Sequence, residues 1–284
     1  MMAAKSKSNV MNHSSTLSPN DWNGKAPPPP AEPLRVPFFR FIYRASRSNR
    51  AVDRFLTSFL KHRHYLPTVP AEAIIPNFAT SEVVLRDLPR GLWATPLVDT
   101  LTVVKSAIGF KSKRILEIGS YKGSTALLIA ENTSPDTLIW TLDKYPDHGE
   151  AYLGTKYESR ITRIVGDATN ELLDGHGPFD LIFVDADHDY ESVFQHTIVA
   201  FRQLAPGGVI LWHDYQQDDC LHGCCGVPEA LHMAALTFQK EILSIEGTML
   251  GIYSGVGNGK PESEASHDNL SEPNPWHDNR IHSI

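Results

Sequence analysis

The sequence of 284 residues has no apolar run near the roughly 20 residues that span a bilayer, and no apolar stretch follows its first residues. We therefore expect no transmembrane segment and no signal peptide. Only three cysteines occur, close together, unlike a secreted disulfide framework. This favours a reducing compartment, so we expect a cytoplasmic protein. The net charge of −7 argues against broad nucleic-acid affinity.

Two segments keep more than one interpretation. The cysteines Cys220, Cys224 and Cys225 could bind zinc together with His222, but they lack the paired C-x₂-C units of structural zinc sites. We therefore expect a loop that lines the substrate site, and a zinc site and a loop without a role in the site are the alternatives. Residues 35–66 are basic and carry an apolar helical stripe. Such a segment is typical of a cap over an active site, of a dimer contact, or of a surface for membranes or nucleic acid. A homodimer is therefore one possible assembly.

Composition divides the chain into four parts. Residues 1–35 and 255–284 are rich in polar residues, glycine or proline, and we predict a disordered N-terminal tail and a flexible C-terminal tail. Residues 36–92 are predicted to form an N-terminal helical cap. Residues 93–254 are predicted to form an α/β domain.

The α/β prediction comes from regular alternation along 93–254. Strand-like runs occur at 114–118, 138–142, 161–165, 181–184 and 209–212, and helical stretches at 124–132, 149–157, 169–174, 190–204 and 227–238. Alternation of this kind implies right-handed crossovers and a parallel, Rossmann-like doubly wound sheet. Residues 241–245 and 249–253 flank Glu246-Gly247-Thr248, which predicts a terminal hairpin and an antiparallel strand.

The first strand breaks at a glycine turn, Gly119-Ser-Tyr-Lys-Gly123, before a helix starts at Ser124. Such a turn lets a ligand approach the backbone and the helix N-terminus. Tyr121 and Ala126 replace the second and third glycines of the dinucleotide fingerprint G-x-G-x-x-G, which disfavours a dinucleotide. Glu117 adds a negative charge that suits a ligand with an ammonium and a sulfonium.

Every predicted parallel strand ends in an acidic residue. These residues are Glu117, Asp143, Asp167, Asp185 and Asp214. Ligands of open parallel sheets bind beyond the carboxyl ends of the strands. We therefore expect the five carboxylates along one edge, around one ligand.

Two motifs carry a resemblance to a known family. Glu117-Ile-Gly-Ser-Tyr-Lys-Gly-Ser-Thr-Ala126 and Phe183-Val-Asp-Ala-Asp-His-Asp-Tyr190 resemble class I S-adenosylmethionine (SAM)-dependent methyltransferases, closest to the catechol and macrocin O-methyltransferase-like branches. The resemblance spans about 93–254 and implies a seven-stranded sheet whose last strand is antiparallel. It also implies SAM as cofactor and methyl transfer to a hydroxyl or amine of a small molecule, such as a specialised metabolite.

The resemblance implies a role for each matching residue. Glu117 and the turn backbone would hold the methionine end, Asp143 both ribose hydroxyls, and Asp167 the adenine amino group with Ala168 against the ring. Asp185 would end its strand beside the reactive methyl. The implied cofactor-binding set is Glu117, Gly119, Ser120, Tyr121, Gly123, Ser124, Asp143, Asp167, Ala168 and Asp185.

Catalysis has two alternatives. Catechol-type relatives bind magnesium at positions that correspond here to Asp185, His213 and Asp214, with a lysine base at the position of His188. The two carboxylates suit a hard ion, whereas His213 suits zinc, iron or nickel better, so a divalent-metal site at these three residues stays open. Without metal, His188 or His213 would act as general base beside Asp185.

Other functions compete with this interpretation. A nucleic-acid methyltransferase is favoured only by the basic segment, and Asp185-Ala-Asp-His188 lacks the Pro-Pro-aromatic turn of enzymes that methylate base amines. A dinucleotide-binding oxidoreductase or a cofactor-binding protein without turnover is the third alternative. We expect a small-molecule substrate and no nucleic-acid partner.

Overall fold

The computed structural model describes residues 17–28, 66–86, 93–215 and 226–255. The cysteine segment and most of the predicted helical cap and C-terminal tail lie outside these ranges. Within them, no helix is both long enough and apolar enough to cross a membrane.

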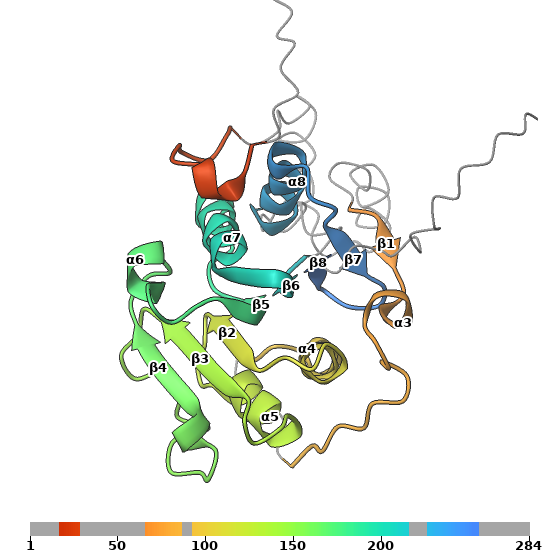
Figure 1. The fold of residues 1–284 in the computed structure, drawn as a ribbon, viewed down its shortest axis with the longest axis vertical. Helices are drawn as coiled ribbons and strands as arrows, with labels where there is room; N and C mark the ends of the chain where they lie inside the picture. The colour runs from red at the N-terminus through yellow and green to blue at the C-terminus, as the bar shows by residue number, and fades with distance from the viewer. Residues whose placement is uncertain (1–16, 29–65, 87–92, 216–225, 256–284) are drawn as a thin grey trace, which may run out of the picture.

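Eight strands form a single sheet in the order β1-β7-β8-β6-β5-β2-β3-β4 (Figure 1). The strands are β1 (Thr68–Val69), β2 (Arg114–Ile118), β3 (Leu138–Asp143), β4 (Ile161–Val165), β5 (Phe179–Val184), β6 (Leu204–Trp212), β7 (Leu243–Ile245) and β8 (Gly251–Ser254). Strand β8 is antiparallel to β6 and β7, and the other neighbours are parallel. The predicted Rossmann-like sheet with an antiparallel last strand is confirmed.

The predicted count of seven strands is wrong by one. Strand β1 pairs in parallel with β7 at the sheet edge, so Thr68–Val69 extends the sheet. Close behind it, the short helix α3 (Ala71–Ile74) brings Ala71 and Ile75 into the same buried cluster as Val103. Residues 66–86 therefore belong to the α/β domain instead of a separate cap. A two-residue strand carries too little pattern to be recognised in a sequence.

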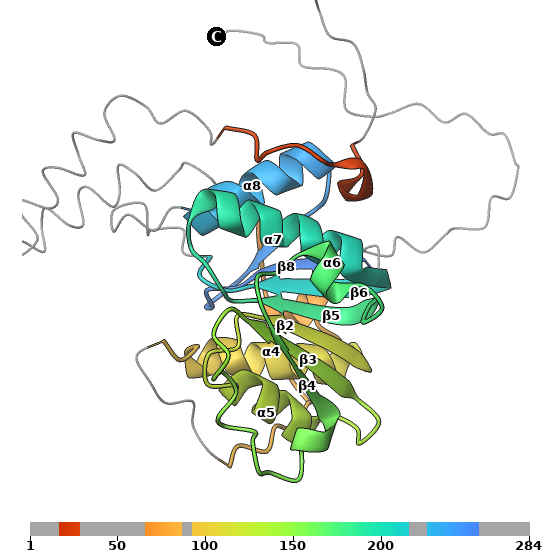
Figure 2. The same ribbon diagram turned by 90° about the vertical axis from the view of Figure 1, so that its left-hand side faces the viewer.

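Helices cover both faces of the sheet (Figure 2). Helices α4 (Leu97–Gly109) and α5 (Ser124–Asn132) lie on one face, and α7 (Tyr190–Gln203) and α8 (Gly226–Phe238) on the other, with α6 (Asn170–Leu173) nearby. Strand side chains alternate between two cores: Leu116 joins the α7–α8 side and Ile115 the α4–α5 side. The layers leave the carboxyl ends of the strands open between them.

Helix α7 begins where its sequence predicts and positions the loop before it. The Asp189 side chain accepts a hydrogen bond from the Ser192 amide at 3.0 Å, which caps the first turn. Val193, Phe194 and Ile198 then bury one face against the sheet. This fixed start holds His188 close to the end of β5.

The helix predicted at 149–157 is absent. This segment forms turns, followed by the 3₁₀ helix η2 (Glu158–Arg160). Tyr152 is buried there, and its hydroxyl lies 2.9 Å from the Thr141 hydroxyl. The packing of this one side chain against β3 outweighs the local helix propensity of the segment. A short stretch of sequence does not reveal such a contact.

Part of the predicted disordered tail is ordered. Residues 17–28, which contain the 3₁₀ helix η1 (Pro19–Asp21), lie along α7 and α8 (Figure 2). The Trp22 ring meets Phe194 and Phe238 edge-on at centroid distances of 6.1 and 5.9 Å. Arg202 donates hydrogen bonds to the Pro19 and Trp22 carbonyls. One aromatic anchor offsets the ordering cost that the polar composition alone would not cover.

Trp22→Ala is expected to lower the free energy of unfolding by about 1–3 kcal/mol, because it removes a half-buried aromatic from this contact. For a domain of this size the melting temperature should fall by about 2–8 °C. Thermal denaturation followed by circular dichroism measures the change. Leu17→Ala is the matched control, since Leu17 is exposed. Equal melting temperatures for the two variants would show that Trp22 does not anchor the segment.

Candidate active site

A cavity of about 590 Å³ opens at the carboxyl ends of the central strands. The structure brings all five strand-end acids to its wall: Glu117, Asp143, Asp167, Asp185 and Asp214. It also places Gly119, Ser120, Tyr121, Ser124, Ala168, His188 and His213 there, whereas Gly123 is absent from the lining. The cavity is therefore strongly acidic, which favours a ligand that carries positive charge.

The two glycines of the turn serve different purposes. Gly119 has a φ of +90°, and a side chain there would overlap the Asp185 carbonyl. Gly123, at φ +77°, is the N-cap of α5, and a side chain there would overlap the Tyr152 ring. Gly119 thus lets the turn pass close to β5, and Gly123 shapes the helix start. The predicted contact of Gly123 with a cofactor stays a prediction beside this structural role.

Asp143 holds the glycine turn in place. Its Oδ2 accepts hydrogen bonds from the amides of Ser120 at 3.0 Å and Tyr121 at 2.8 Å, and its Oδ1 accepts one from the Tyr145 amide at 3.0 Å. Tyr121 has a φ of +46°, which these bonds help to maintain. A carboxylate has about four acceptor positions, so Asp143 retains capacity for a ligand hydroxyl.

Glu117 lies at the end of β2 with only 1% of its surface exposed. Its Oε2 and the Ser120 hydroxyl are buried without a hydrogen-bond partner in the described part of the chain. Burial raises the pKa of Glu117 to about 8, and the charges of Asp185 and Asp143 add to the effect. An unpaired buried acceptor on the cavity wall fits a ligand ammonium group, such as that of the methionine end of SAM.

His213, after β6, is enclosed by carboxylates. Its Nδ1 lies 3.1 Å from Asp185 Oδ1 and 3.2 Å from Asp214 Oδ2, and its Nε2 lies 3.3 Å from Asp99 Oδ2. Burial alone would lower the pKa of His213, but these hydrogen bonds outweigh it and raise the pKa to about 12. Both ring nitrogens of His213 thus already face carboxylates. Its predicted roles as general base and as metal ligand stay predictions.

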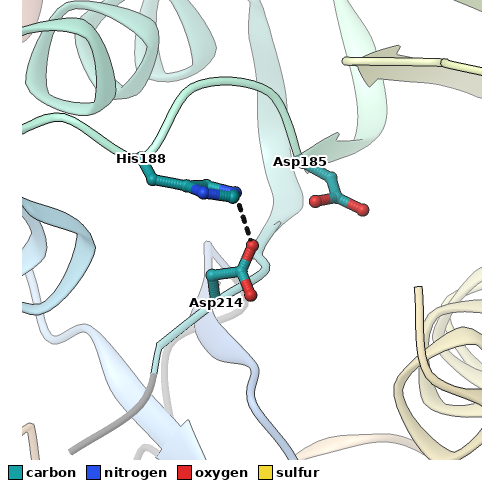
Figure 3. Close-up of side chains that lie close together, drawn as sticks. All are labelled: Asp185, His188 and Asp214. Atoms are coloured by element: carbon teal, nitrogen blue, oxygen red, sulfur yellow. Dashed lines mark ion pairs between the residues drawn. The ribbon is translucent and has the colours of Figure 1, made fainter. Parts of the chain in front are cut away.

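His188 is placed differently. Its Nε2 lies 2.7 Å from Asp214 Oδ2, and Asp185 lies beside this pair (Figure 3). The hydrogen bond that His188 donates to Asp214 raises the pKa of His188 above its usual value. Ligand atoms of Asp185, His188 and Asp214 all lie within 4.8 Å of one another. His188 is therefore a further candidate ligand for a divalent ion beside the predicted Asp185 and Asp214, and the predicted ligand His213 stays a prediction.

Comparisons with known proteins point to one family. Residues 116–215 match the model of a methyltransferase domain family. This part of the chain is therefore similar to a methyltransferase domain. The matched range runs from β2 through Tyr215, so the domain match includes all five strand-end acids.

Curated proteins that match the chain are named O-methyltransferases. The chain is 32% identical over 131 residues to the catechol O-methyltransferase of Mycobacterium tuberculosis, covering 44% of this chain and 57% of that protein. It is 30% identical over 118 residues to the O-methyltransferase ankF of Aspergillus thermomutatus, covering 39% and 47%. The chain spans about half the length of these curated relatives.

Solved structures also resemble the chain. One is an O-methyltransferase of Streptomyces achromogenes involved in tomaymycin synthesis, in complex with SAM. It is 19% identical, covers 72% of this chain and 95% of that one, and has a TM-score of 0.47.

The cavity wall and its surroundings contain site residues that the sequence analysis missed. Asp99 is fully buried on α4; besides its contact with His213, its Oδ1 accepts a hydrogen bond from the Met249 amide at 3.0 Å. The Thr95 hydroxyl donates to Asp185 Oδ2 at 2.8 Å. A carboxylate within the apolar run 97–109 was the available signal, since buried charges are rarely unpaired.

Proposed function

We propose that this chain is a SAM-dependent methyltransferase that methylates an oxygen or nitrogen of a small molecule, with His188 as general base. The observation that carries the proposal is the His188–Asp214 pair beside Asp185, in a cavity whose wall is acidic. When bound, SAM would supply a methyl group that its sulfonium already activates.

The acids give the cavity its preference for such a ligand. Glu117 would bind the ammonium, Asp143 the ribose hydroxyls, and Asp167 the adenine amino group, with Ala168 against the ring. Asp185 places a negative charge near the position expected for the sulfonium. The same carboxylates would repel the pyrophosphate of a dinucleotide and the backbone of a nucleic acid, so neither alternative gains support here.

His188 is suited to remove the acceptor's proton. A donor at Nε2 toward Asp214 leaves Nδ1 with the lone pair that accepts a proton, and Asp214 then stabilises the imidazolium that forms. This arrangement fixes the tautomer and the ring orientation. His213, enclosed by Asp99 and Asp185, supplies a buried positive charge that keeps the neighbouring carboxylates ionised.

A divalent ion is the alternative use of the same three side chains. Asp185 and Asp214 offer carboxylate oxygens, and His188 adds an imidazole that favours zinc, iron or nickel over magnesium. A ligating His188 has no role as base. Metal dependence therefore distinguishes the two versions of the proposal.

The test is incubation of the purified protein with SAM labelled in its methyl group and a metabolite extract, with and without EDTA. A labelled small-molecule product insensitive to EDTA supports His188 as base. Loss of product with EDTA, restored by added metal, supports the ion. Absence of labelled product together with absence of binding to S-adenosylhomocysteine (SAH), the demethylated cofactor, would refute the proposed function.

Asp143→Ala is expected to weaken SAH affinity by about 10–100-fold. It removes an acceptor for the ribose and releases the amides of Ser120 and Tyr121. Turnover at saturating SAM should change little. Isothermal titration calorimetry measures the affinity, with Asp147→Ala as control because Asp147 is exposed and outside the cavity lining. Equal affinities in the two variants would contradict the assigned role.

A further inference from the structure

His196, on α7, lines the cavity but has no part in the roles above. Its Nδ1 is buried and has no hydrogen-bond partner among the described residues. Because Nδ1 is buried, the other ring nitrogen, Nε2, is the polar atom of His196 that a ligand in the cavity could contact.

The proton of this ring belongs on Nε2. A buried N–H without a partner costs more than a buried lone pair, so Nδ1 is the unprotonated nitrogen. Burial lowers the pKa of His196, which keeps the ring neutral near pH 7. His196 therefore presents a neutral N–H donor to a cavity that also contains several carboxylates.

His196 belongs to the part of the cavity near the end of β4. The charges of Asp187 and Asp167 act on its ring, and α6, which follows Ala168, packs against α7. The nearby ammonium of Lys144 is paired with Asp187 at 3.2 Å. The acceptor Asp167 and the donor His196 thus lie close enough for the charge of Asp167 to act on the His196 ring.

Adenine offers the matching pattern. Its amino group donates, and its ring nitrogens accept. Hypoxanthine, which carries a carbonyl and an N–H on the corresponding edge, presents the reverse pattern. A carboxylate paired with a neutral N–H donor therefore suits adenine specifically.

We propose that His196 donates a hydrogen bond from Nε2 to an adenine ring nitrogen of the cofactor and, with Asp167, selects adenine over other bases. This inference depends on the proposed function, because it requires SAM or SAH in the cavity. His196 would act in binding, so its loss should raise the KM for SAM and leave kcat unchanged.

Calorimetry with SAH and its 1-deaza, 3-deaza and 7-deaza analogues tests the proposal, since each analogue lacks one adenine ring nitrogen. His196→Phe is expected to weaken SAH binding about 5–10-fold. His196→Gln, which places an amide N–H near the position of Nε2, should restore most of the affinity. One analogue should bind the wild type about as weakly as SAH binds His196→Phe, with no further loss in that variant.

His232→Phe is the control, since His232 lies on α8 outside the cavity lining. If His196→Phe binds SAH as tightly as the wild type does, the role of His196 is refuted and the proposed function still stands. An equal loss for every analogue, which indicates a merely structural role, would refute it as well. If the wild type does not bind SAH, the proposed function fails and this inference fails with it.

Discussion

His188→Ala is expected to lower kcat for methyl transfer by about 10²–10⁴-fold, the usual contribution of a positioned general base. Affinity for SAH should stay within about twofold, because His188 pairs with Asp214 and not with the acids assigned to the cofactor. Initial rates with the acceptor found in the labelled extract, together with calorimetry on SAH, separate the two quantities.

His232→Ala serves as the control, since it removes an imidazole outside the cavity lining. The metal content of the wild type and of His188→Ala, measured by mass spectrometry, separates a base from a ligand. A base leaves both preparations without stoichiometric metal. An ion lost together with activity assigns His188 to the metal. A kcat equal to that of the wild type would refute both roles.

The sequence predicts the architecture well because the relevant signals are local. Alternating apolar runs and the turn between Gly119 and Gly123 specify the strands, the crossovers and the ligand edge. The strand-end acids follow, since parallel strands bring their carboxyl ends to one edge. The features that failed depend on partners distant in sequence: Trp22 on α7 and α8, and Thr68–Val69 on β7.

The site is predictable in position but only partly in role. His213 and His188 both follow strand ends, and nothing local distinguishes them. The difference comes from Asp99 on α4, which occupies the second nitrogen of His213 from 114 residues away. His188 has one carboxylate partner at 2.7 Å and keeps its other nitrogen for chemistry. Contacts of long sequence separation, not residue type, therefore decide which histidine is suited to act as base.

Glu117→Gln is expected to stabilise the protein while it weakens cofactor binding. With a pKa of about 8, folded Glu117 holds a proton at pH 7 that the unfolded chain, at 4.5, has already released. Glu117 therefore lowers the free energy of unfolding of the wild type by an amount that grows between about pH 4.5 and 8. The gain of the variant should be absent near pH 4.5 and reach the order of 5 kcal/mol above pH 8. Urea unfolding across this range measures it, with the exposed Glu150→Gln as control.

The proton on Glu117 should also reveal where the ammonium group of the ligand binds. An ammonium placed against Glu117 favours the ionised carboxylate, so SAH binding at pH 7 should release close to one proton. Calorimetry in buffers of different ionisation enthalpy measures this release. In Glu117→Gln the release should vanish and affinity should fall by about 10²–10³-fold, because the ammonium loses its counter-charge in a buried site. Binding without proton release in the wild type would place the ammonium elsewhere.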